Sequence, residues 1–106
     1  MAETYKSFGT ALGTTAATSI YAGVAGVAIV NGINISNVNG TGSTTITVEM
    51  VKGATAFSML SNCAVNAGTS IQILDAPMVL DSGNTIRATA GLTGYFHTIV
   101  SVLEMT

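Results

Sequence analysis

Residues 31–50, NGINISNVNGTGSTTITVEM, contain two runs in which apolar and polar side chains alternate, separated by a glycine-rich corner. Successive side chains of a β-strand point to opposite faces, so the alternation predicts two strands that each hide one face. Asn39 and Gly40 at the corner tolerate the positive φ angles of a turn. We therefore predict that this stretch folds as a β-hairpin, with Gly32 marking a bulge or a close backbone approach in its first strand.

The same alternation recurs along the chain, with turn signals about every ten residues and no 3.6-residue apolar stripe that would indicate a helix. The last run, residues 95–105, is apolar on both faces, which is typical of a strand that is central in a sheet or covered by a neighbour. The predicted strands are residues 18–21, 27–36, 44–51, 55–60, 69–74, 85–90 and 95–105.

This spacing of strands and turns favours an all-β fold, and we expect a single-domain antiparallel β-sandwich, either a jelly roll or immunoglobulin-like, with about eight strands. Residues 14–106 would form the sandwich. Residues 1–13 would form an extended N-terminal arm that carries Tyr5 and Phe8.

The composition is poor in charge. Only 8% of the 106 residues are charged, where about a quarter is usual, and the mean hydropathy is +0.58. Uncharged polar side chains can be buried between chains without the desolvation penalty of an ion, so the composition suits a subunit of a homo-oligomer or a larger assembly. A net charge of −2 argues against nucleic acid as a direct ligand.

The N-terminal residues MAETYKSFGT have neither the basic region nor the apolar core of a secretory signal, and Cys63 is the only cysteine. We therefore expect synthesis and folding in a reducing cytoplasm. The longest nearly apolar stretch, residues 20–30, is shorter than the ~20 residues that a membrane-spanning helix needs, so we expect no membrane span.

Residues that could perform chemistry are isolated in the sequence. His97 is the only histidine, and its neighbours in the strand point to the opposite face, which favours a surface or interface position. Cys63 has no basic neighbour that would activate it and is expected to be a small core residue. Asp75 and Asp81 could hold a calcium ion across a loop, but aspartates at turns more often bond their own backbone. We therefore expect no catalytic, metal or cofactor site.

The order of features resembles a group of small structural proteins of tailed bacteriophages, many from marine and cyanobacterial phages. The resemblance covers essentially the whole chain and rests on strand and turn residues. The matching features are a Thr-rich N-terminal segment ending in Ile20-Tyr21, then INISNVNG (33–40), NAGTSIQIL (66–74), LDSGNTIRATA (80–90) and the terminal LEMT (103–106).

This resemblance implies a β-sandwich virion component without enzymatic activity, assembled in the host cytoplasm. We expect a capsid decoration or cement subunit that binds the major capsid protein or another virion protein. A neck, tail or fibre accessory subunit, a host-surface binding module and a calcium-dependent binding module are the alternatives. The predicted partner contacts are Tyr5, Lys6 and Phe8 in the arm and Asn37, Asn39 and Thr41 in the loop region 37–43.

Overall fold

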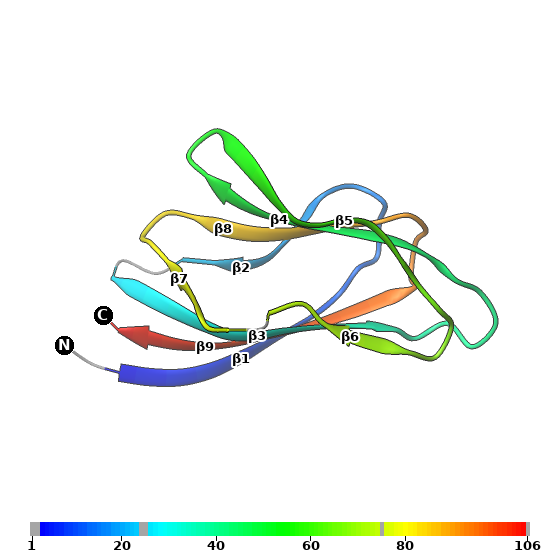
Figure 1. The fold of residues 1–106 in the computed structure, drawn as a ribbon, viewed down its shortest axis with the longest axis horizontal. Helices are drawn as coiled ribbons and strands as arrows, with labels where there is room; N and C mark the ends of the chain where they lie inside the picture. The colour runs from blue at the N-terminus through cyan, green and yellow to red at the C-terminus, as the bar shows by residue number, and fades with distance from the viewer. Residues whose placement is uncertain (1–2, 24–25, 75, 106) are drawn as a thin grey trace.

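A computed structural model describes residues 3–23, 26–74 and 76–105, and these residues form two antiparallel β-sheets packed face to face (Figure 1). The predicted all-β sandwich is confirmed. Within the described residues there is no helix, and so none that could cross a membrane. The strands are β1 (Glu3–Ala11), β2 (Thr18–Ala22), β3 (Val27–Asn37), β4 (Thr44–Lys52), β5 (Thr55–Val65), β6 (Ser70–Gln72), β7 (Met78–Leu80), β8 (Thr85–Ala90) and β9 (Phe96–Met105).

The five-stranded sheet has the order β1-β9-β3-β6, with β7 also paired to β3. β9 is an interior strand that is paired on both sides, as its two apolar faces predicted. The four-stranded sheet has the order β2-β8-β4-β5. The two sheets form separate layers in Figure 1, and β1 starts beside the end of β9.

The predicted hairpin over residues 31–50 is wrong, although both of its strands exist. β3 belongs to the five-stranded sheet and β4 to the four-stranded one, so residues 38–43 cross between the layers. Each strand hides one apolar face, and in a sandwich these faces meet across the core instead of lying side by side. The hairpin that does form joins β4 to β5 at Gly53, whose φ of 64° suits the tight turn.

The bulge predicted at Gly32 is confirmed, because the pairing of β3 with β9 shifts register between Val30 and Gly32. The Gln72 side chain of β6 covers this position, and its Oε1 accepts a hydrogen bond of 2.6 Å from the Ile33 amide. A Cβ atom at Gly32 would lie 3.3 Å from that same Oε1. The bulge therefore brings the backbone close to a neighbouring side chain, as expected for an interior glycine.

The core lies between the sheets and is built from the alternate side chains that the sequence pattern predicted. In β8, Ile86, Ala88 and Ala90 are buried while the residues between them are half-exposed. Phe96 is the largest fully buried side chain. The buried apolar set is Leu12, Ile20, Tyr21, Ala28, Val30, Ile33, Ile35, Ile46, Val48, Val65, Leu80, Ile86, Ala88, Ala90, Phe96, Val100 and Val102.

The predicted N-terminal segment is extended, but over residues 3–11 it is the edge strand of the five-stranded sheet. β1 pairs with β9 from Glu3↔Met105 to Ala11↔His97 without a shift of register. These residues are therefore part of the sandwich in this structure and not a free arm.

Candidate interaction surface

The outer face of the five-stranded sheet, which points away from the core, carries a row of apolar side chains across four strands. Register pairs align Tyr5 of β1 with Leu103 of β9, Leu103 with Ile29 of β3, and Ile29 with Val79 of β7. Directly opposite residues of antiparallel strands point to the same face, so these four form one continuous row. The second apolar face that the sequence predicts for β9 therefore belongs to this row.

Much of this face is open to solvent. Tyr5 is 77% exposed, Val79 58% and Ile99 49%, and Val27 at the end of β3 is also exposed. These are four of the seven large apolar side chains that the described part of the chain exposes. Contiguous apolar patches of several hundred Å² on a soluble protein typically mark interaction sites.

The same face is nearly free of charge. Among its strand residues, all of which the structure describes, Glu3 is the only Asp, Glu, Lys or Arg, and His97 is the only histidine. The outer face of the four-stranded sheet is different, because it carries threonines and the ion pair between Arg87 Nε and Glu49 Oε1 at 2.8 Å. The two broad faces of the sandwich therefore have different chemistry.

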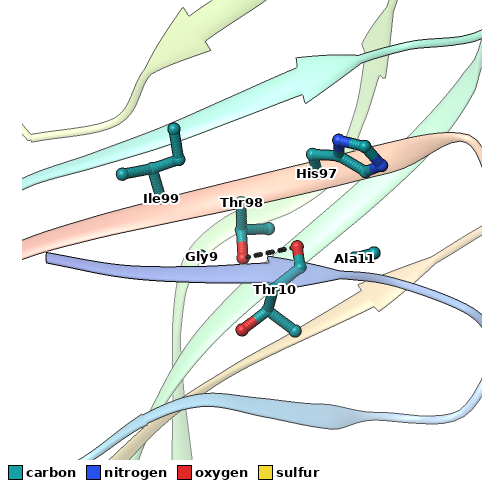
Figure 2. Close-up of a pocket in the computed structure, with 6 residues that line it drawn as sticks. All are labelled: Gly9, Thr10, Ala11, His97, Thr98 and Ile99. Carbon is teal, nitrogen blue, oxygen red and sulfur yellow. Dashed lines mark hydrogen bonds between the residues drawn. The ribbon is translucent and has the colours of Figure 1, made fainter.

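A shallow hollow of about 280 Å³ lies between β1 and β9 (Figure 2). Its lining residues are Gly9, Thr10, Ala11, His97, Thr98 and Ile99. Figure 2 shows His97 and Ile99 projecting from one side of β9 and Thr98 from the other, where its hydroxyl donates to the Thr10 carbonyl at 3.3 Å. Gly9 and Ala11 lack bulk beside the two larger side chains, and a Cβ at Gly9 would meet nothing within 4 Å. The hollow can receive a side chain but offers no enclosed substrate site.

Lys6, one of the predicted contact residues, lies on the inner side of β1, where its half-exposed side chain binds a buried carboxylate. Its Nζ lies 2.9 Å from Oε1 of Glu104, and the Tyr21 hydroxyl donates to Oε2 of the same carboxylate at 2.7 Å. Glu104 is buried, and these two hydrogen bonds hold the pKa of its carboxyl below the ordinary value. Burial, followed by the bond to Glu104, raises the pKa of the Tyr21 phenol far above its usual range. The cluster joins β1, β9 and β2, and so connects both sheets.

Phe8 also faces inward. Its ring packs on Tyr21 with centroids 5.1 Å apart and the planes tilted by 54°. Of the three predicted contacts in β1, only Tyr5 lies on the open outer face, because alternate residues of a strand point in opposite directions.

The predicted loop contacts divide in a similar way. Asn37 is only 2% exposed, and its amide nitrogen donates to the carbonyls of Gly42 and Val65 at 3.1 and 2.9 Å. Asn39 is half-buried and uses its side-chain oxygen to accept from the amides of Thr41 and Gly42. Thr41 is exposed. Asn37 and Asn39 thus shape the crossover from within, and Thr41 is the predicted loop residue that stands at the surface.

Replacing Asn37 with alanine is expected to lower the free energy of unfolding by about 2 kcal/mol, because the Gly42 and Val65 carbonyls would lose their amide donor. The measurement is urea unfolding at equilibrium. Thr41→Ala is the matched control in the same loop and should change the stability by less than about 0.5 kcal/mol, since Thr41 is exposed. Equal losses in the two variants would contradict the internal role of Asn37.

The residues considered for chemistry remain apart. His97 is exposed, as predicted, while Cys63 is half-buried on β5 and outside the core, contrary to the prediction. Asp81 forms an exposed pair with Lys52 at 3.6 Å, and Asp75 lies outside the described residues. In the part of the chain that the structure describes, no group of three or more His, Cys, Asp or Glu residues is placed to hold a metal.

Comparison of the sequence with models of protein families and with curated proteins finds no match. The candidate site therefore depends on the geometry alone. Sequence reasoning missed Glu104 and Tyr21, although Glu104 shares the alternation of Val100 and Val102 and so had a visible signal of an inward position.

Proposed function

We propose that the protein is a non-enzymatic structural subunit that binds other protein chains through the outer face of its five-stranded sheet. The observation that carries this proposal is the apolar row Tyr5–Leu103–Ile29–Val79, exposed at Tyr5 and Val79 and half-buried at the two residues between them, on a face with almost no charge. Such a face can be covered by a partner with little electrostatic cost, because few ions must be stripped of water.

The size of the face is consistent with this role. Three strands of about ten residues and two of three residues, with roughly 4.8 Å between strands and 3.4 Å per residue, give a flat area of ~590 Å². Side-chain relief increases that value toward the ~800 Å² that each partner contributes to a standard protein interface. A partner that follows the row Tyr5–Leu103–Ile29–Val79 would cross the whole width of the sheet.

The assembly proposed for this subunit is the virion of a tailed phage, where it would decorate or cement the capsid shell. This part of the proposal is supported by the resemblance of strand and turn residues along the chain, and a broad face with almost no charge suits attachment to a repeating protein lattice. Many copies bound side by side would make attachment persistent through multivalency. Counting copies of the chain in purified particles tests the location: hundreds support the shell, and a dozen or fewer contradict it.

Val79→Lys is expected to weaken binding to empty shells of the parent phage at least tenfold. Val79 is exposed and lies on β7, so the substitution leaves the core intact, but it would place an unpaired ammonium in the covered face. Binding of the purified chain to the shells is measured by co-sedimentation over a range of concentrations.

The matched control for this prediction is Phe57→Lys. Phe57 is 50% exposed, similar to Val79, but lies on β5 of the four-stranded sheet. The control should bind as the unchanged chain does. If Phe57→Lys abolished binding and Val79→Lys did not, the contact would belong to the other sheet, and the assignment of the outer face would fail.

A further inference from the structure

The edges of the two sheets differ in regularity, and β1 is the most regular one. Its nine pairs with β9 run without a shift, whereas β5 is interrupted by two register shifts against β4 and by Asn62 at a φ of 45°. β2 is short and shifted, and β6 and β7 have three residues each. Among the described strands, β1 is therefore the one that offers a long, straight row of unpaired backbone groups.

Natural edge strands usually carry charges, prolines or bulges that block pairing with another chain. β1 has no proline and no bulge. Its only lysine, Lys6, is bound to Glu104 on the inner side, and its only carboxylate, Glu3, is at the end of the strand. The middle of this edge is consequently unprotected.

The hydrogen bonding of β1 shows which residues face the open edge. The Leu12 amide donates to the Phe96 carbonyl at 2.9 Å, in continuation of the β1–β9 register. Because successive residues of an antiparallel strand point their N–H and C=O groups to alternate sides, the odd-numbered residues of β1 present theirs to the open edge. These include Tyr5, Ser7 and Gly9.

We infer that two copies of this chain pair through their β1 strands, antiparallel and around a two-fold axis at Ser7, so that two five-stranded sheets become one. This register is the one in which all nine residues Glu3–Ala11 find a partner. Ser7 then lies opposite Ser7 of the second copy. The odd-numbered residues pair with each other, as their outward N–H and C=O groups require, and roughly ten hydrogen bonds can form.

The same register matches the side chains. Tyr5 of each copy lies opposite Gly9 of the other, where the shallow hollow beside Ile99 and His97 is open. An aromatic side chain across from a glycine on a neighbouring strand packs over the gap that the glycine leaves. Because Tyr5 and the hollow are both on the outer face and both flank Ser7, each copy fills the hollow of its partner, as a two-fold interface demands.

The charges allow this pairing as well. Lys6 lies opposite Phe8 of the second copy and Glu3 opposite Ala11, so no like charges meet. Registers shifted by two residues lose this property or shorten the overlap; a two-fold at Lys6, for example, would place two ammonium groups face to face. The full-length register is therefore favoured by backbone, packing and charge together.

The dimer adds detail to the proposed function. It rests on that function because both treat the chain as one subunit of an assembly. A two-fold axis perpendicular to the sheet keeps both outer faces on the same side, so the uncharged rows of the two copies join into one surface of twice the width. Each dimer would then bind a protein lattice through two copies of the apolar row.

The test uses the full chain without any partner and measures its mass by sedimentation equilibrium. The unchanged chain is expected to have twice the 10.7 kDa of one copy. Ser7→Lys and Ser7→Glu, which are tolerated by the fold because Ser7 is exposed, should each weaken self-association at least tenfold, since like charges meet at the axis. An equimolar mixture of the two variants should restore the dimer, because opposite charges then meet.

Two further variants keep the result interpretable. Ser58→Lys places the same charge on the exposed part of β5 and should leave the dimer intact. Tyr5→Ala removes the ring that occupies the hollow, so it should weaken the dimer while the melting temperature of the monomer is kept, because Tyr5 is 77% exposed. A monomeric unchanged chain, a dimeric Ser7→Lys variant, or a mixture that stays monomeric would overturn the inference.

These outcomes separate the dimer from the proposed function. A chain that is monomeric alone yet binds shells through Val79 would retain the proposed function and refute the dimer. A dimer whose Val79→Lys variant binds shells as well as the unchanged chain would retain the dimer and refute the proposed binding face.

Discussion

Replacing Phe96 with alanine is expected to lower the free energy of unfolding by about 3–5 kcal/mol, a large part of the ~5–15 kcal/mol that stabilises a domain of this size. Phe96 is fully buried at the start of β9, between β1 and β3 of the same sheet. Removing the ring loses the free energy that is gained when the ring moves from water into the core. It also leaves a cavity that a two-layer core cannot easily close. Urea unfolding followed by circular dichroism measures the loss.

The chain supplies its own controls for this prediction, because its three phenylalanines occupy three levels of burial. Phe8 is half-buried on Tyr21, and Phe57 is 50% exposed on the edge strand β5. The cost of substitution by alanine should therefore fall in the order Phe96, Phe8, Phe57, with Phe57 below about 1 kcal/mol. A Phe57→Ala variant as unstable as Phe96→Ala would mean that β5 is covered by something else, such as another copy.

The sequence predicted seven of the nine described strands, all but β1 and β7, because the signal for a strand is local. In β8, the alternation of side chains identifies both the element and its buried face, and the structure confirms them; in β9, where both faces are apolar, it identifies the element alone. The pairing of β3 could not be predicted in the same way. Alternation in residues 31–50 is equally compatible with a hairpin and with a crossing between layers, since the choice depends on what β9 and β5 offer elsewhere in the chain.

The candidate site was predictable only in part. Tyr5 was identified, and the two apolar faces of β9 indicated that Ile99 and Leu103 needed a cover or an interface. Asn37 was chosen as a loop contact, but the direction of an amide is decided by carbonyls that the chain brings in from a distance, here that of Val65. Composition predicts that a loop is polar and does not predict which of its side chains turn inward.

Replacing Glu104 with alanine is expected to destabilise the fold by about 3 kcal/mol at neutral pH, because it breaks a buried pair and leaves the Tyr21 hydroxyl without its acceptor. The Lys6 ammonium is half-exposed and can turn to water, which keeps the loss at the lower end of the range for buried pairs. Tyr21→Phe removes only the hydroxyl and should cost about 1.5 kcal/mol. Both values come from urea unfolding at neutral pH.

The pH dependence distinguishes the charge of Glu104 from its packing. The hydrogen bond from Tyr21 and that from Lys6 hold the pKa of this carboxyl below its ordinary value in the folded protein, so the unfolded chain binds the proton more readily. The stabilisation is therefore complete above an ordinary glutamate pKa of about 4.3 and is lost as the pH falls through the lower folded value. Glu104→Gln, which cannot titrate, should lie well below the unchanged chain in stability at neutral pH and approach it in acid. A difference between the two proteins that is constant from neutral to acidic pH would mean that the carboxylate contributes by its shape alone.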